Sequence, residues 1–203
     1  MVADIGHDGP EGEHNERFRN RCALLIAVLA AVLAISSLGG GNATDDMLFN
    51  NIKASDTWAF YQAKNIRQTS YKVAADQLRR DLVALDPASA HGQAIAADIK
   101  KYEDAIERYE NEPDPGRPGD ATAGEGKAQL RARAQAYEAA REQAMERDSA
   151  FDLSEMILQL AIVLGSVAIL ALSRPLAYIS VGLGVLGAIL VADGYLLFFP
   201  IPF

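Results

Sequence analysis

The segment Cys22–Leu38 (CALLIAVLAAVLAISSL) decides the fold, because it is an apolar run without a charged side chain. Two further apolar runs, Met156–Leu172 and Leu176–Phe199, follow near the C-terminus. A bilayer core is about 30 Å thick and is crossed by roughly 20 apolar helical residues. The third run has this length, and the first two reach it once Gly39–Gly41 or Ser173 is included. We therefore predict three transmembrane helices, at residues 22–41, 155–173 and 176–199.

A secretory signal peptide is the alternative interpretation of the first run, since Arg17, Arg19 and Arg21 precede it. No clean small-x-small cleavage site follows, and the leader is long and acidic, so we favour a retained anchor. The leader, residues 1–21, is predicted to be a disordered cytoplasmic tail, because residues 1–16 lack hydrophobic periodicity and contain Gly, Pro and several acids.

The arginines beside the spans predict the orientation, because cytoplasmic segments carry an excess of Lys and Arg. Three arginines precede the first span, and Arg174 lies in the turn between the second and third spans. With three crossings, these two sites fall on the same side. Arg141 and Arg147 lie near the opposite side, so the contrast is incomplete. We predict a multi-pass protein of the bacterial inner membrane, with a cytoplasmic N-terminus and residues 45–154 in the periplasm.

The composition limits the classes of function. The formal net charge is −8, which argues against a nucleic-acid partner, because phosphates require a basic surface. The one cysteine, Cys22, cannot form an internal disulfide. The sequence contains no Gly-rich phosphate loop, no Cys/His metal spacing and no nucleophile–base arrangement, so we predict no cofactor, no metal site and no enzymatic activity.

Residues 45–154 are predicted to form a helical extramembrane domain. The glycines Gly39–Gly41 weaken the first helix, and Thr44 or Asp45 can cap a new one. From there to Asp86 the sequence contains no Pro or Gly. Apolar residues recur every seven positions along this stretch, at Ile52, Ala59, Ile66 and Val73, and a shifted stripe of Leu78, Leu82 and Leu85 follows.

Asp86-Pro87 predicts a helix stop and restart, because proline disfavours helix at the residue before it. The second helix alternates apolar residues by four and three, which is the pattern of one helix packing along another; these residues are Ile95, Ile99, Tyr102, Ile106 and Tyr109. Residues 111–127 are rich in Pro and Gly and are predicted to be a flexible linker. The fold class is therefore an all-α membrane protein with three transmembrane helices and a long, coiled-coil-like helical hairpin outside the membrane.

Two segments carry a resemblance to a known family. Asn20–Gly41 (NRCALLIAVLAAVLAISSLGGG) and Ala54–Arg67 (ASDTWAFYQAKNIR) resemble an uncharacterised bacterial membrane-protein family, the domain of unknown function 4337. The layout is also similar: one anchor, a helical extramembrane region, and two closely spaced spans near the C-terminus. The resemblance implies this architecture and no catalytic residues, so it implies nothing about a reaction or substrate.

The second of these segments is a candidate interface, because amphipathic aromatic and cationic side chains are common at interface hot spots. The candidate residues are Trp58, Phe60, Tyr61, Gln62, Lys64 and Arg67. The alternative is that they pack within the chain, with Lys64 and Arg67 in solvent. An oligomer would satisfy both interpretations.

The third span carries a row of small residues that predicts close helix packing, against the second span or a neighbouring protomer; these residues are Ser180, Gly184, Ala188 and Ala192. Asp193 is the one ionisable residue inside the second and third spans, and we expect Gln159 to be its polar partner. An intramembrane acid is a candidate functional residue, although Asp193 lies near the outer end of its span, where an interfacial role is the alternative.

The sequence favours a non-enzymatic membrane protein that acts as an oligomeric scaffold or partner-binding module through its extramembrane helices. Its expected partners are the lipid bilayer, other copies of itself and another membrane protein. A different class is the alternative: a subunit of a small oligomeric ion channel or transporter that uses Asp193. Three spans are too few to enclose a pathway in one chain, so this alternative also requires oligomerisation.

Overall fold

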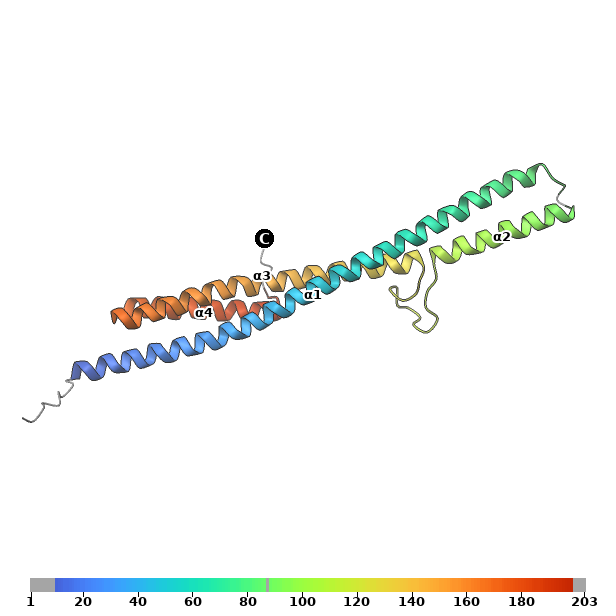
Figure 1. The fold of residues 1–203 in the computed structure, drawn as a ribbon. Coiled ribbons are helices and arrows are strands. Elements are labelled where there is room, and N and C mark those ends of the chain that lie inside the picture. The colour runs from blue at the N-terminus through green and yellow to red at the C-terminus, as the bar shows by residue number, and fades with distance from the viewer. Residues whose placement is uncertain (1–9, 87, 199–203) are drawn as a thin grey trace, which may run out of the picture. The chain divides into compact units, whose positions relative to one another are not determined.

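The computed structural model describes residues 10–86 and 88–198, and all regular structure within them is helical (Figure 1). Its four helices are α1 (Pro10–Val83), α2 (Ala90–Glu110), α3 (Lys127–Ala171) and α4 (Arg174–Leu196). Three of them, α1, α3 and α4, are long and apolar enough to cross a membrane. The prediction of an all-helical chain with three candidate membrane-spanning helices is therefore confirmed.

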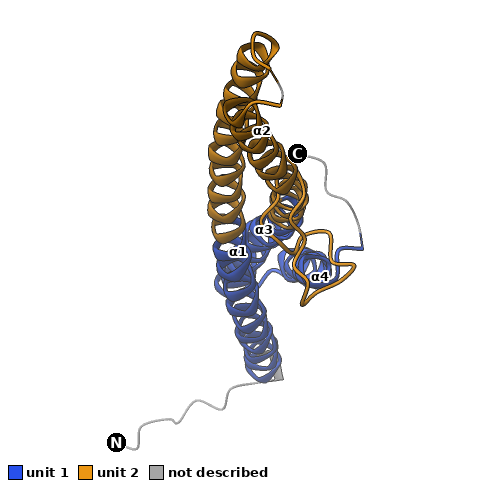
Figure 2. Ribbon diagram, turned by 90° about the vertical axis from the view of Figure 1, so that its right-hand side faces the viewer, with its two compact units in different colours: residues 1–47, 142–203 blue, residues 48–141 orange. Residues whose placement is uncertain are grey.

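The chain divides into two compact units (Figure 2). Unit 1 consists of residues 1–47 and 142–203, and contains the apolar part of α1, the second half of α3, and α4. Unit 2 consists of residues 48–141, and contains the second half of α1, α2 and the start of α3.

Helix α1 begins earlier than the sequence predicts. Residues 1–21 are expected to be disordered, but α1 is helical from Pro10, while residues 1–9 lie outside the described part. Once a helix exists in the span, each further residue adds a hydrogen bond at low entropic cost. Proline is also favoured in a first helical turn, where its missing N–H is not needed. Glu13 and Arg17 add an exposed i,i+4 ion pair at 3.4 Å.

Helix α1 also continues through Gly39–Gly41, where the sequence predicts a break. The reason lies in the packing of Phe151, which is 2% exposed. A Cβ at Gly39 would lie 2.5 Å from the Phe151 ring, and one at Gly194 on α4 would lie 2.8 Å from it. Glycine lowers the helix propensity at these positions, but the missing Cβ lets α1 and α4 pack closely against the Phe151 ring. The ring meets Tyr195 edge-on, with 5.0 Å between ring centroids.

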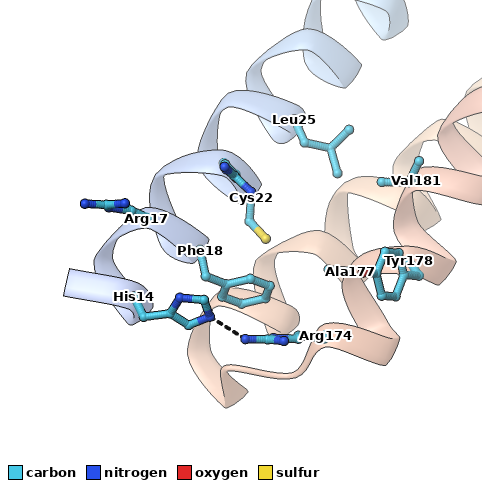
Figure 3. Close-up of a pocket in the computed structure, with 10 residues that line it drawn as sticks. His14, Arg17, Phe18, Cys22, Leu25, Arg174, Ala177, Tyr178 and Val181 are labelled. Atoms are coloured by element: carbon cyan, nitrogen blue, oxygen red, sulfur yellow. Dashed lines mark hydrogen bonds between the residues drawn. The ribbon is translucent and has the colours of Figure 1, made fainter. Parts of the chain in front are cut away.

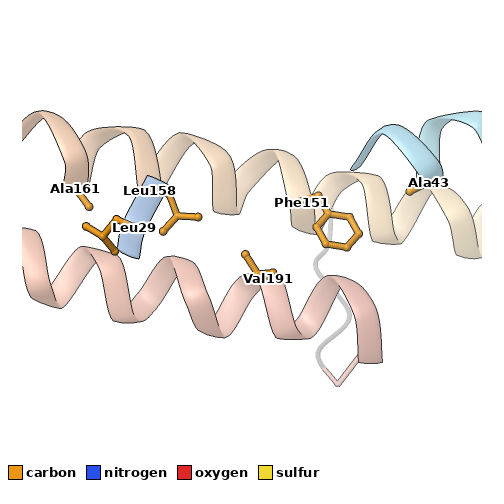
Figure 4. Packing of buried hydrophobic residues seen from close by; sticks show 6 residues of the cluster. All are labelled: Leu29, Ala43, Phe151, Leu158, Ala161 and Val191. Carbon is orange, nitrogen blue, oxygen red and sulfur yellow. The ribbon is translucent and has the colours of Figure 1, made fainter. Parts of the chain in front are cut away.

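The core of unit 1 lies where α1, α3 and α4 meet (Figure 4). Its buried residues are Leu29 and Ala43 of α1, Phe151, Leu158 and Ala161 of α3, and Val191 of α4. The outward faces of the same helices carry exposed apolar side chains, among them Leu24, Leu38 and Leu170. Exposed apolar surface on all helices of a bundle is what a lipid environment requires.

In unit 2, α2 and then α3 run back along α1. Tyr71 of α1 packs on Tyr102 and Tyr109 of α2, with centroid distances of 5.4 and 5.8 Å. Helix α2 begins at Ala90, and Ser89 caps it by accepting a 3.0 Å hydrogen bond from the Gly92 amide. Helix α1 ends at Val83, before the predicted stop, and Pro87 lies outside the described residues.

Residues 111–126 form a folded loop, where the sequence predicts a flexible linker. The Arg133 guanidinium donates to the Thr122 carbonyl at 2.7 and 2.9 Å and to the Gly124 carbonyl at 2.7 Å. Pro113 and Gly124 form an isolated antiparallel bridge. Gly124 has φ of +125°, and a Cβ there would collide with the Glu112 carbonyl, so this position requires glycine.

Helix α4 follows α3 after a tight turn in which Leu172 has φ of +48°. Pro175 occupies the first turn of α4, where proline is tolerated. The helix ends at Leu196, and Leu197 closes it in the left-handed conformation, with its amide donating to the Asp193 carbonyl at 2.6 Å. The predicted span therefore ends earlier than expected, and Phe199 lies outside the described residues.

Candidate interaction surfaces

The six residues of the predicted interface divide between two faces of α1. Trp58 and Tyr61 are half-buried and Lys64 is buried, whereas Phe60, Gln62 and Arg67 are exposed. The Trp58 indole N–H donates to Glu138 Oε1 on α3 at 2.8 Å. Trp58 and Tyr61 meet edge-on, with 5.5 Å between their ring centroids. Three residues of the cluster are therefore buried or half-buried within unit 2, and three are exposed.

Lys64 is the most buried charged side chain of this cluster, with 4% of the residue exposed. Its Nζ lies 3.4 Å from Glu112 Oε2 and 3.6 Å from Glu125 Oε2, and it donates to the Glu125 carbonyl. It also lies 5.2 Å from the centroid of Phe60 and 5.7 Å from that of Tyr109. The alternative interpretation, packing within the chain, left Lys64 in solvent; the structure instead buries it, because the loop after α2 folds over it.

A second group of polar residues joins the end of α2 to α1 and α3. Gln68, 2% exposed, donates to the Ile106 carbonyl and to Glu110 Oε2, each at 2.9 Å. Lys127 donates to Asn65 Oδ1 at 3.1 Å and lies 3.0 Å from Glu110 Oε2. The hydrogen bond from Gln68, then that from Lys127, holds the pKa of Glu110 below its usual range.

We call Lys64, Gln68, Glu110 and Lys127 the polar latch. Its donors are directed at backbone carbonyls and carboxylates of the same chain, so the latch closes the α2–α3 loop against α1. Within the described residues, no group of three or more His, Cys, Asp and Glu side chains could hold a metal ion.

The outward face of α1 in unit 2 carries an exposed row of mainly apolar residues. Ile52, Ile66 and Val73 are 59%, 67% and 61% exposed, and Phe49 is 57% exposed. The positions of the row alternate by three and four along α1: Phe49, Ile52, Asp56, Ala59, Ala63, Ile66, Ser70 and Val73. We call these eight residues the outer seam. All are exposed, so α2 and α3 pack on a different face of α1.

The seven-residue stripe that the sequence singles out is thus on the outer face. The inner face consists instead of small, aromatic and polar residues, among them Ala54, Lys64, Gln68, Tyr71 and Ala75. On α2, by contrast, the predicted seam is the covered face: Ile99 is buried, Ile95, Tyr102, Ile106 and Tyr109 are half-buried, and the two tyrosines pack on Tyr71 of α1.

The small residues of the third span also divide between two faces. Ser180 is buried and donates to the Ala161 carbonyl at 2.7 Å, and Gly184 is buried against Leu29. Ala188 and Ala192 are exposed. A step of four residues overshoots a 3.6-residue turn, so a strict four-residue row drifts around the helix. The buried face alternates four and three instead: Ser180, Gly184, Gly187, Val191 and Gly194.

The structure buries Asp193, at 2% exposed, and leaves Gln159 exposed. Gly194, the residue after Asp193, lies against Phe151 of α3. Asp193 is therefore beside the turn of α3 that contains Phe151. Gln159 is two turns further along α3, about 12 Å at 1.5 Å per residue. The structure therefore separates the two levels along α3, and the partnership between Asp193 and Gln159 stays a prediction.

Sequence reasoning missed a buried pair of hydroxyls. Ser36 and Ser154, both 0% exposed, hydrogen-bond each other, and Ser154 also donates to the Phe151 carbonyl at 2.8 Å. A signal for Ser36 exists, because Cys22, Leu29, Ser36 and Ala43 recur every seven residues and all four are buried.

Comparison with known proteins supports the resemblance noted from the sequence. The family model described as "Domain of unknown function (DUF4337)" matches residues 18–197, well beyond the two segments that carry the resemblance. No curated protein matches the chain. No solved structure matches it either.

Proposed function

This chain belongs to the family described as a domain of unknown function (DUF4337), and we propose that it is a membrane-anchored scaffold that self-associates through α1. The outer seam is the observation that carries this proposal. Apolar residues spaced by 3.5 on average are the pattern by which helices of different chains pack. In the outer seam, the side chains of Ile52, Ile66 and Val73 are each more than half exposed, so α2 and α3 of the same chain do not cover this row.

A second copy of the chain is the partner that fits the outer seam. Copies anchored in one membrane by the same spans enter it in the same direction, so their seams run parallel and in register. In that register Ile52, Ala59, Ile66 and Val73 of one copy meet the same residues of the other. The small residues Ala59 and Ala63 at the centre let the two helices approach closely.

Asp56 is the one charged residue in the outer seam. In a parallel pair two Asp56 carboxylates would face each other, which weakens the contact. A polar residue at a single seam position is a known way to fix register and oligomer state at a cost in stability. We infer that Asp56 keeps the association in one register, and that Asp56→Leu strengthens it.

The proposal includes a location. From the arginines at the ends of the spans, we propose that the N-terminus is cytoplasmic and that unit 2 lies in the periplasm at the bacterial inner membrane. The proposed function is non-enzymatic, and the proposed partner is a second copy of the chain. The exposed Ala188 and Ala192 of α4 are small enough to let neighbouring copies approach within the bilayer.

Disulfide crosslinking of the full-length chain tests the proposal. Ser70, in the outer seam, and Lys72, exposed on the same helix outside it, are each changed to cysteine in a Cys22→Ser background. In membranes under mild oxidation, Ser70→Cys should crosslink between chains and Lys72→Cys should not. Equal crosslinking of both would mean random collision and would remove the outer seam from the proposal.

A disruption experiment complements the crosslinking. Ile66→Asp places a charge in the outer seam, whereas Val83→Asp places one at an 89% exposed position outside it. Native mass spectrometry of the detergent-solubilised chain should show an oligomer for the wild type and Val83→Asp, and a monomer for Ile66→Asp. A wild type that is monomeric at every concentration would defeat the proposal.

An ion channel or transporter subunit is the second candidate, and the burial of Asp193 is the observation that favours it. A buried acid at a span is costly and is often functional. Ion flux through the chain in proteoliposomes that Asp193→Asn abolishes would support this candidate. Flux that survives the substitution, or the absence of flux, would leave Asp193 as a packing residue.

A further inference from the structure

Unit 1 contains a cavity of about 540 Å³ between α1 and α4, at the end of the spans where the arginines gather (Figure 3). Cavities of this size are within the range that holds small ligands. The wall on α1 includes Phe18, Cys22 and Leu25, and the wall on α4 includes Ala177 and Val181. Cys22 is 5% exposed, so it forms the floor.

The rim of the cavity is basic. Arg21 and Arg174 line it from opposite helices, and among the described lining residues none is acidic. The Arg174 guanidinium, which carries only donors, donates to His14 Nε2 and is held at the mouth. Arg17 also belongs to the rim, but its side chain extends away from α4 and pairs with the exposed Glu13.

The start of α4 adds to this positive potential. Ser173 occupies the N-cap position but makes no side-chain hydrogen bond to the free amides of the first turn. Those amides and the helix dipole favour an anion near Arg174. Two arginines, a helix N-terminus and a cavity therefore converge on one place.

The interior of the cavity is apolar, in contrast to its rim. Leu25 and Val181 belong to the apolar runs of the first and third spans, so the cavity reaches from the level of the arginines into the hydrocarbon level. An inorganic anion would fill only the rim. A ligand with an anionic head and an apolar tail would fill both parts.

We propose that this cavity binds an anionic phospholipid of the leaflet that contacts the N-terminal side of the spans. The phosphate lies between the Arg21 and Arg174 guanidinium groups, and an acyl chain lies along Leu25 and Val181. Basic pockets between transmembrane helices are suited to such headgroups. The site is distinct from the outer seam and does not depend on self-association.

Native mass spectrometry of the full-length chain in a neutral detergent tests this proposal, with phosphatidylglycerol and phosphatidylcholine supplied at equal concentration. Phosphatidylglycerol should be retained in preference. Arg21→Gln and Arg174→Gln should each weaken its retention about fivefold, as expected for one basic residue at a membrane surface. Arg19→Gln removes the same charge from the same helix end without touching the cavity, and should retain lipid as the wild type does.

Two further arms separate a lipid site from its alternatives. Val181→Trp fills the interior without changing charge, so it should abolish retention even if an arginine variant is unstable. Inorganic phosphate should not displace the lipid. Equal retention of both lipids, a loss in Arg19→Gln equal to that in Arg174→Gln, full displacement by phosphate, or retention by Val181→Trp would each overturn the proposal.

Discussion

At the scale of single residues, the burial of Lys64 explains why the α2–α3 loop is ordered. A buried ammonium group is costly unless it is paired, and Lys64 reaches Glu112, Glu125 and two aromatic rings. The carboxylates remain accessible, with side-chain exposures of 39% and 71%. Each pair alone contributes little, but together they use the ammonium group to fix the loop.

Replacing Lys64 with methionine should release the loop while largely preserving side-chain volume. The carboxylates it leaves are solvated, so we expect a cost on the order of 1–3 kcal/mol, below that of a fully buried pair. Cleavage by endoproteinase Asp-N before the exposed Asp120, within the loop, should become faster. Lys72→Met, an exposed change on the same helix, should leave the rate unchanged. Equal rates in Lys64→Met and wild type would mean that Lys64 does not hold the loop.

Acid should also loosen the polar latch through Glu110. The hydrogen bonds from Gln68 and Lys127 lower the pKa of Glu110 in the folded chain below its usual value of 4.5. The folded state therefore binds this proton less readily than the unfolded state. The resulting stabilisation is complete above pH 4.5 and is lost as the pH falls through the lower, folded-state pKa.

The measurement is the urea midpoint of Trp58 fluorescence, followed from neutral pH to about pH 3. The wild-type midpoint should fall at the acid end, and Glu110→Gln should start lower and fall less. Glu107→Gln, a change at an exposed position of the same helix, is the control and should titrate as the wild type does. Parallel acid curves for the wild type and Glu110→Gln would contradict the role of Glu110.

At the scale of elements, hydrophobic periodicity predicted where helices occur and which face α2 buries, but not which face α1 buries. In unit 2 the larger apolar residues of α1, such as Ile52 and Ile66, are exposed, while Ala54 and Ala75 are buried. Large aromatic partners, Tyr71, Tyr102 and Tyr109, fill the space between α1 and α2. A stripe chosen by side-chain size therefore selects the face that remains open.

The sequence predicted a helix break correctly only where contacts with other helices do not stabilise a continuous helix. Three glycines in a row predict a break, yet Phe151 needs Gly39 to pack, and α1 continues. The Pro- and Gly-rich loop does end a helix, because its backbone bonds are completed by Arg133 from α3. Such long-range contacts are not visible in local sequence.

The two faces of α4 give a matched test in unit 1. A Cβ at Gly184 would lie 2.5 Å from Leu29, so Gly184→Leu should separate α4 from α1. Overpacking a tight interface costs about 1–3 kcal/mol. Ala188 is exposed, so Ala188→Leu should be tolerated. The thermal stability of each detergent-solubilised variant measures the difference, and equal losses would mean that the packing face of α4 is misassigned.

At the scale of the whole molecule, charge differs between the two ends of the spans. Arg17, Arg19, Arg21 and Arg174 mark one end, whereas Asp148, Asp152 and Glu155 follow one another where α3 approaches its apolar part. At this second end the Thr44 hydroxyl donates to Asp148 Oδ1 at 2.7 Å, joining α1 to α3. An excess of arginine at one end favours that end in the cytoplasm.

Cysteine accessibility in intact bacteria tests this orientation with single substitutions. Arg117 lies in the exposed loop of unit 2, and Arg19 is exposed before the first span. In a Cys22→Ser background, Arg117→Cys should react with a membrane-impermeant maleimide in intact cells, because unit 2 is expected in the periplasm. Arg19→Cys should react only after the membrane is opened. Three crossings require the two sites to lie on opposite sides, so labelling of both in intact cells would contradict the three-span arrangement itself. The reversed pattern would keep three spans but place unit 2, with its outer seam, in the cytoplasm, where the partner copy would have to be sought.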